Sequence, residues 1–99
     1  MVTQEERNII LKTLSPYKPK KVGIFGSRVR RDHSEKSDLD LLVDIENINL
    51  LELVEIENSL SRLLNIKVDL VTEASLNKHL RPLIEKQIEY ILQEEGQDS

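Results

Sequence analysis

The stretch that decides the fold is residues 22–45, which read VGIFGSRVRRDHSEKSDLDLLVDI. Residues 22–25 form a short apolar segment followed by Gly26, a pattern typical of a buried strand. Residues 26–37 have no hydrophobic periodicity and are rich in charge, so they form a polar loop. Asp38 to Ile45 alternates well enough to form a second strand, so the stretch predicts strand, loop, strand.

Residues two apart on a strand share a face. The core face of the second strand should carry Leu39, Leu41, Val43 and Ile45, and the opposite face Asp38, Asp40, Leu42 and Asp44. Asp38 and Asp40 therefore bring two carboxylates within reach of one divalent ion or an adjacent pair. Because the chain has no cysteine and this cluster contains only oxygen donors, magnesium or manganese is favoured over zinc. Asp44 is roughly 13 Å from Asp40 along an extended strand and should be peripheral.

Gly26 and Ser27 are suited to holding a phosphate. Glycine at the end of a strand lets backbone N–H groups approach an anion, and the serine hydroxyl adds a donor. Arg28 is the arginine favoured to meet the same phosphates. Whether Arg30, Arg31 or Lys36 also contact them is left open, because loop charges are commonly only solvated. Each half of the pattern is common alone, and only the combination is informative.

The remaining elements follow from caps and periodicity. Thr3 with Glu6 predicts a helix that ends before Ser15-Pro16, and Asn49 with Glu52 predicts a second over residues 50–64. Residues 66–71 predict a third strand; beside the second, it would bring Asp69 to the carboxylate pair. The spacing of apolar residues predicts a last amphipathic helix over about residues 81–92. His33 and His79 are expected at the surface, and Tyr17 and Tyr90 in packing.

Composition indicates one domain spanning residues 1–99, with residues 95–99 as a tail. The polar start, the absence of a long apolar run and the absence of cysteine favour a cytoplasmic protein without membrane segments. A net charge of −4 argues against general nucleic-acid binding. Residues 1–36 nevertheless contain nine Lys and Arg against four Asp and Glu, while residues 37–99 contain five against fourteen. A basic segment that runs into a carboxylate cluster suits a small polyphosphate with bound metal.

The stretch of residues 22–45, with Lys67 to Val71, resembles the signature of the minimal nucleotidyltransferases, relatives of DNA polymerase beta, and the resemblance covers about nine tenths of the chain. It implies an α+β fold with a small mixed sheet flanked by helices. It also implies that Gly26 and Ser27 hold the triphosphate of ATP, that Asp38 and Asp40 bind two magnesium ions, and that Asp69 is the third carboxylate. Arg31 stands where many relatives have glycine, which affects the turn of the loop but removes no ligand.

The same resemblance implies a partner. Such domains frequently accompany a helical HEPN-family ribonuclease toxin and act as its antitoxin by transferring AMP to a tyrosine hydroxyl. Two alternatives remain open from the residues: a non-catalytic module that binds nucleotide and neutralises its partner by occlusion, and a metal-dependent nuclease. The acidic overall charge and the Gly26-Ser27 turn disfavour the nuclease.

Overall fold

The computed structural model describes residues 2–25 and 39–93, which form a mixed four-stranded sheet with helices on both faces. The strands are β1 (Lys21–Phe25), β2 (Leu39–Asp44), β3 (Val68–Thr72) and β4 (Glu89–Gln93), in the spatial order β3-β2-β1-β4. β1 is antiparallel to both β2 and β4, and β2 is parallel to β3. The expected α+β architecture is confirmed.

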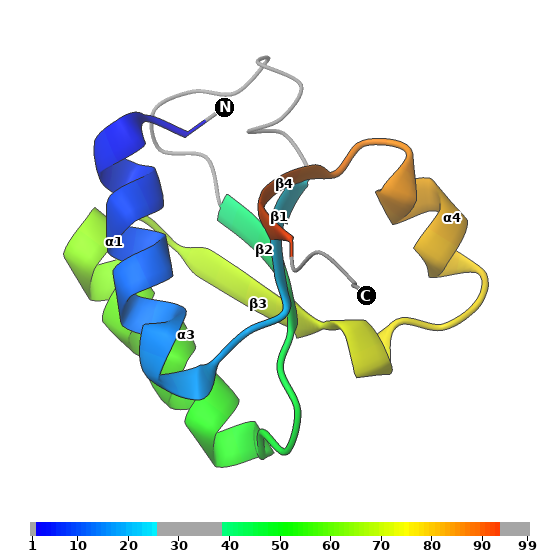
Figure 1. Ribbon diagram of the computed structural model, residues 1–99, viewed down its shortest axis with the longest axis horizontal. Helices are drawn as coiled ribbons and strands as arrows, with labels where there is room; N and C mark the ends of the chain where they lie inside the picture. Colours follow the sequence, from blue (N-terminus) through cyan, green and yellow to red (C-terminus); the bar gives the residue numbers. More distant parts are fainter. Residues whose placement is uncertain (1, 26–38, 94–99) are drawn as a thin grey trace.

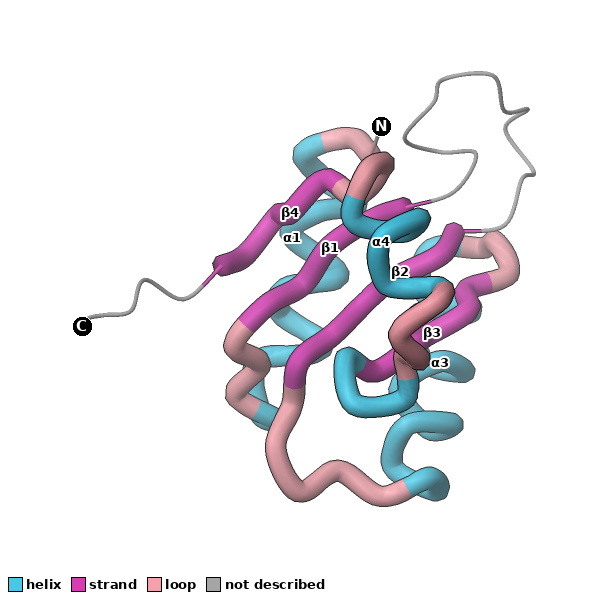
Figure 2. The backbone as a smooth tube through the Cα atoms, turned by 90° about the vertical axis from the view of Figure 1, so that its right-hand side faces the viewer, coloured by secondary structure: helices cyan, strands magenta, loops and turns pink. Residues whose placement is uncertain are grey.

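Two capped helices cover one face of the sheet. α1 (Gln4–Leu14) begins with the predicted capping box, in which the Glu6 amide donates to Thr3 Oγ1 at 3.1 Å and the Thr3 amide donates to Glu6 Oε1 at 2.9 Å. α3 (Leu50–Leu64) begins with the equivalent box of Asn49 and Glu52. Figures 1 and 2 show both helices on the same side of the sheet and α4 (Leu80–Glu85) on the other.

The core lies between the sheet and the pair α1–α3. Alternation along the strands turns one set of apolar side chains toward the helices, and each helix contributes its own apolar stripe. The side chains of this core with no more than 3% exposure are Ile10, Leu14, Val22, Ile24, Leu39, Leu41, Val43, Ile56, Leu60 and Val68. The predicted core face of the second strand is therefore confirmed. Short 3-10 turns at Ser15–Tyr17 and Glu73–Ser75 follow α1 and β3.

The predicted helix over residues 81–92 is wrong in its second half. α4 ends at Glu85, and the chain then forms β4, which pairs with β1 through Val22↔Leu92 and Gly23↔Tyr90. Without β4, the outer edge of β1 would have no strand partner, and a paired backbone outweighs helical periodicity in a short segment. Two of the three Ile residues that suggested a helical stripe instead contact different faces of the sheet, Ile88 at Gly23 and Ile91 at the core.

Leu42 is buried, with 1% exposure, although it lies on the face that α1 and α3 do not cover. Its register partner is Gly23, and a Cβ built on Gly23 would come within 2.5 Å of Ile88 Cδ1 and 3.1 Å of Tyr90 Cδ1. The segment between α4 and β4 therefore packs directly on this second face. None of the helices in the described part of the chain is long and apolar enough to cross a membrane.

Candidate active site

Asp40 and Asp69 lie next to each other at the end of the sheet where β2 begins. They are register partners on the parallel strands β2 and β3, so their side chains leave the same face. On its other side Asp40 is the register partner of Phe25, the last residue of β1. All three side chains are half-buried. One row across three strands thus contains an aromatic ring followed by two carboxylates.

The position of Asp69 depends on α3, which fixes the outer edge of β3. The amides of the two neighbours of Asp69 both donate to side chains of this helix, Val68 to Ser61 Oγ at 3.0 Å and Leu70 to Glu57 Oε2 at 2.7 Å. An edge strand has unpaired backbone groups, and these two bonds satisfy part of that edge. Ser61 and Glu57 are four residues apart on α3, so they share the face of the helix that meets β3.

The donor set suits a hard divalent cation. Asp40 and Asp69 supply only carboxylate oxygens, the ligand type that magnesium prefers. Residues 2–25 and 39–93 do not by themselves contain a cluster of three or more His, Cys, Asp or Glu able to hold a metal ion. Asp38, the predicted partner of Asp40 in metal binding, lies outside these ranges. The predicted phosphate-binding residues Gly26, Ser27 and Arg28 and the loop charges Arg30, Arg31, His33 and Lys36 lie outside them as well. β1 ends and β2 begins beside Asp40, so both strand ends that flank this segment are at the carboxylate end.

Asp44 is on the same strand as Asp40 but at its opposite end, where its register partner is Lys21. The Lys21 ammonium is 6.0 Å from the centre of the Tyr90 ring. Asp44 therefore shares the strand and the face of Asp40 while lying away from Asp69, which makes it a matched control for the carboxylate pair.

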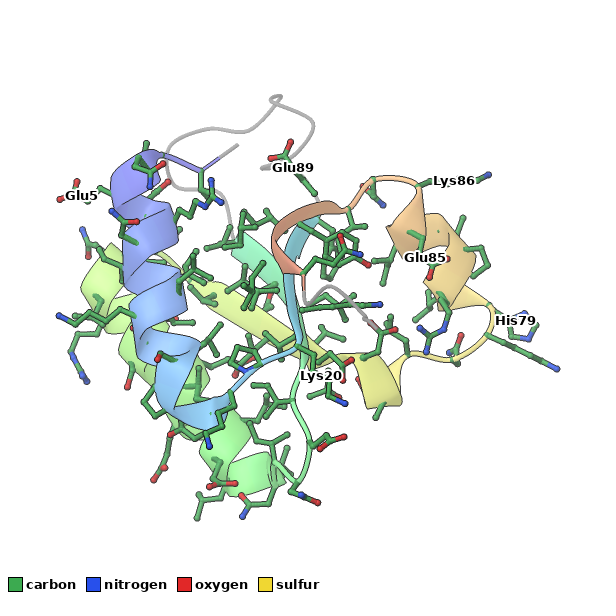
Figure 3. All side chains as sticks on the ribbon, in the orientation of Figure 1. Glu5, Lys20, His79, Glu85, Lys86 and Glu89 are labelled. Atoms are coloured by element: carbon green, nitrogen blue, oxygen red, sulfur yellow. The ribbon has the colours of Figure 1, made fainter. Side chains whose placement is uncertain are left out.

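His79 and two ion pairs lie apart from the carboxylates Asp40 and Asp69. His79 is exposed and projects away from the sheet at the start of α4, as expected for a surface histidine (Figure 3). Arg81 pairs with Glu73 and also donates to the Glu73 carbonyl, which ties α4 to the turn after β3. Lys20 Nζ is 2.8 Å from Glu46 Oε2, and its hydrogen bond and positive charge lower the pKa of Glu46 below its usual value.

Residues 8–96 match the protein family described as Polymerase beta, Nucleotidyltransferase. A relative in Methanocaldococcus jannaschii, assigned by name to the protein adenylyltransferases, is 49% identical over 77 residues, which are 76% of this chain and 79% of the relative. The protein adenylyltransferase MntA of Thermococcus cleftensis is 40% identical over 73 residues, which are 73% of this chain and 74% of MntA.

Solved structures give the same result. One assigned to the minimal nucleotidyltransferases is 32% identical, with a TM-score of 0.75 over 87% of this chain and 89% of that one. Another, from a complex of a tri-AMPylated Shewanella oneidensis HEPN toxin with an MNT antitoxin, is 24% identical, with a TM-score of 0.75 over 91% of this chain and 71% of that one. At 24% identity, the second match shows only that the two proteins share a fold.

Proposed function

Because this chain belongs to the polymerase beta nucleotidyltransferase family, and is thus an enzyme of that class, we propose that it transfers AMP from ATP to a hydroxyl group of a protein. The acceptor oxygen attacks the α-phosphorus, the bond from that phosphorus to the bridging oxygen breaks, pyrophosphate leaves, and the hydroxyl proton passes to water. The observation that carries the proposal is the register pairing of Asp40 with Asp69 at one end of the sheet.

In this proposal Asp38, Asp40 and Asp69 hold two magnesium ions. When bound, such ions neutralise charge on the attacking and leaving oxygens of an in-line displacement. The chain supports this role by fixing the carboxylates on adjacent strands, since β3 is held against α3 on both sides of Asp69. Gly26, Ser27 and Arg28 hold the phosphates of ATP in the same proposal, which is supported by the end of β1 at Phe25, the register partner of Asp40.

The proposed acceptor is a tyrosine of a HEPN-family toxin, which makes this protein the antitoxin of the pair. Support comes from relatives named as protein adenylyltransferases and from the complex of an MNT antitoxin with a tri-AMPylated HEPN toxin. The acceptor hydroxyl must reach the half-buried carboxylate row, and a tyrosine on a partner presents its hydroxyl farther from the backbone than serine or threonine does.

The test is incubation of the protein with magnesium, α-phosphate-labelled ATP and a purified HEPN-family toxin. We expect labelled toxin, and loss of about 100-fold or more of the rate in Asp40→Asn and in Asp69→Asn, because metal-assisted charge stabilisation is worth several kcal/mol. Asp44→Asn, on the same strand and face as Asp40, should keep the wild-type rate. Equal rates in all three variants would overturn the assignment.

The same experiment separates the binding-only alternative. If Asp40→Asn has no transferase activity yet still neutralises the toxin completely at stoichiometric concentration, occlusion rather than modification explains the antitoxin effect. If neutralisation is lost together with labelling while the complex still forms, modification explains it. The assembly is followed by analytical gel filtration in both cases.

A further inference from the structure

Phe25 takes no part in the proposed transfer reaction. It is the only phenylalanine of the chain, and its side chain is half-buried on the carboxylate face rather than in the core between the sheet and the helices. Its register partner is Asp40, and opposed residues of an antiparallel pair have Cβ atoms about 4.5–5.5 Å apart. An aromatic ring is thus the direct neighbour of a proposed metal ligand.

An aromatic ring in this place binds neither metal nor phosphate. Nucleotides contain one group that matches such a ring, the flat base, and stacking of a base on an aromatic side chain is favourable for every base. The ring and the carboxylates therefore match the two chemically different parts of one ligand.

The surface beside Phe25 is apolar as well. Gly23 lies two residues before Phe25 on β1 and so shares its face, and Ile88 packs over Gly23 where any Cβ would come within 2.5 Å of it. Figure 2 shows α4, which leads into Ile88 and β4, in front of this face of the sheet. Phe25 and Ile88 therefore form an apolar surface that lies next to Asp40 on the side of β4.

From these positions we propose that Phe25 is the stacking surface for the base of the nucleotide, with the phosphates and metal over Asp40 and Asp69. The inference rests on the proposed function, since it takes the carboxylate row as the triphosphate end of the site. Because stacking does not read hydrogen bonds on the base, Phe25 contributes affinity for nucleotides in general and leaves the choice between ATP and GTP to other groups.

The test compares binding of ATP, GTP and inorganic tripolyphosphate, each with magnesium, by isothermal titration calorimetry on the full chain. Tripolyphosphate has the charge and metal affinity of the nucleotide tail but no base. We expect Phe25→Leu to weaken ATP and GTP by about tenfold each while tripolyphosphate binds as to the wild type. Phe25→Trp, which keeps a ring, should restore nucleotide affinity. Tyr90→Leu removes the other aromatic ring of this face, beside Gly23 rather than Asp40, and should bind all three ligands as the wild type does.

The outcomes separate this inference from the proposed function. Equal weakening of ATP and tripolyphosphate by Phe25→Leu would mean that the ring only supports the phosphate site, and the inference is overturned. Unchanged ATP affinity in Phe25→Leu overturns it as well. Failure of the wild type to bind both ATP and tripolyphosphate would instead contradict the proposed function. Circular dichroism melting of Phe25→Leu and Phe25→Trp checks that each variant is folded.

Discussion

Asp40 and Asp69 are register partners on the parallel strands β2 and β3, and their carboxylates leave the same face of the sheet. A ligand that binds only the folded protein stabilises it by mass action, about 1.4 kcal/mol at ten times its dissociation constant. We therefore expect magnesium to raise the melting temperature of the wild type and of Asp44→Asn, and to leave Asp40→Asn and Asp69→Asn unchanged. Thermal melts at several magnesium concentrations measure this. A wild-type shift that persists in both variants would place the ion elsewhere.

The edge of β3 is protected by side chains rather than by another strand. Ser61 Oγ accepts from the Val68 amide, so Ser61→Ala should lower the free energy of unfolding by about 1 kcal/mol. Ser59→Ala is the control, because Ser59 is also on α3 but lines a surface cavity instead of meeting β3. Glu57→Ala removes the acceptor of the Leu70 amide and should cost about 1–3 kcal/mol. Glu57→Gln keeps an acceptor oxygen and should cost less. Urea unfolding measures all four; equal stabilities for Glu57→Ala and Glu57→Gln would contradict this account of the edge.

The parts of the fold that the sequence predicts well are those in which local signals agree. Helix α3 matches the predicted residues 50–64, because a capping box and a long apolar stripe point to the same element. β1 and β2 are close to the predicted strands because both are apolar on the core side and bounded by polar or glycine residues. The prediction that Asp69 lies beside Asp40 required only that β3 run next to β2, and the register confirms it.

Residues 81–92 show where local signals fail. Apolar residues at 84, 88 and 91 suit a helical period, but 88–92 is also a short apolar run with β-branched and aromatic residues. The strand is formed because these residues pair with the otherwise free edge of β1, which is far away in the sequence. The roles of Glu57 and Ser61 were missed for a related reason, since a polar residue on a helix shows nothing of the strand amide it meets.

The ion pair between Lys20 and Glu46 predicts a modest pH effect at the surface. The hydrogen bond and charge of Lys20 lower the pKa of Glu46 from its usual 4.5. A lowered carboxyl pKa stabilises the fold above the unfolded value, and this stabilisation is lost as the pH falls through the folded value. We expect Lys20→Met to raise the pKa of Glu46 toward 4.5, and added salt to reduce the difference in the wild type. NMR titration of the Glu46 carboxyl carbon measures both; an unchanged pKa in Lys20→Met would contradict the pairing.

Ile88 packs directly on Gly23, and a double-mutant cycle can measure the energy of that contact. A Cβ at position 23 would lie 2.5 Å from Ile88 Cδ1 and 2.7 Å from Ile88 Cγ1, so Gly23→Ala should cost about 1–3 kcal/mol by overpacking. Ile88→Ala alone should cost less than the about 2–5 kcal/mol typical of a fully buried isoleucine, because Ile88 is half-buried. In the double variant the new methyl group occupies space that the isoleucine has left, so the combined loss should be smaller than the sum. Urea unfolding of the four proteins measures the coupling. Additive losses would mean that Ile88 moves aside freely, and that Gly23 does not hold the segment between α4 and β4 against the sheet.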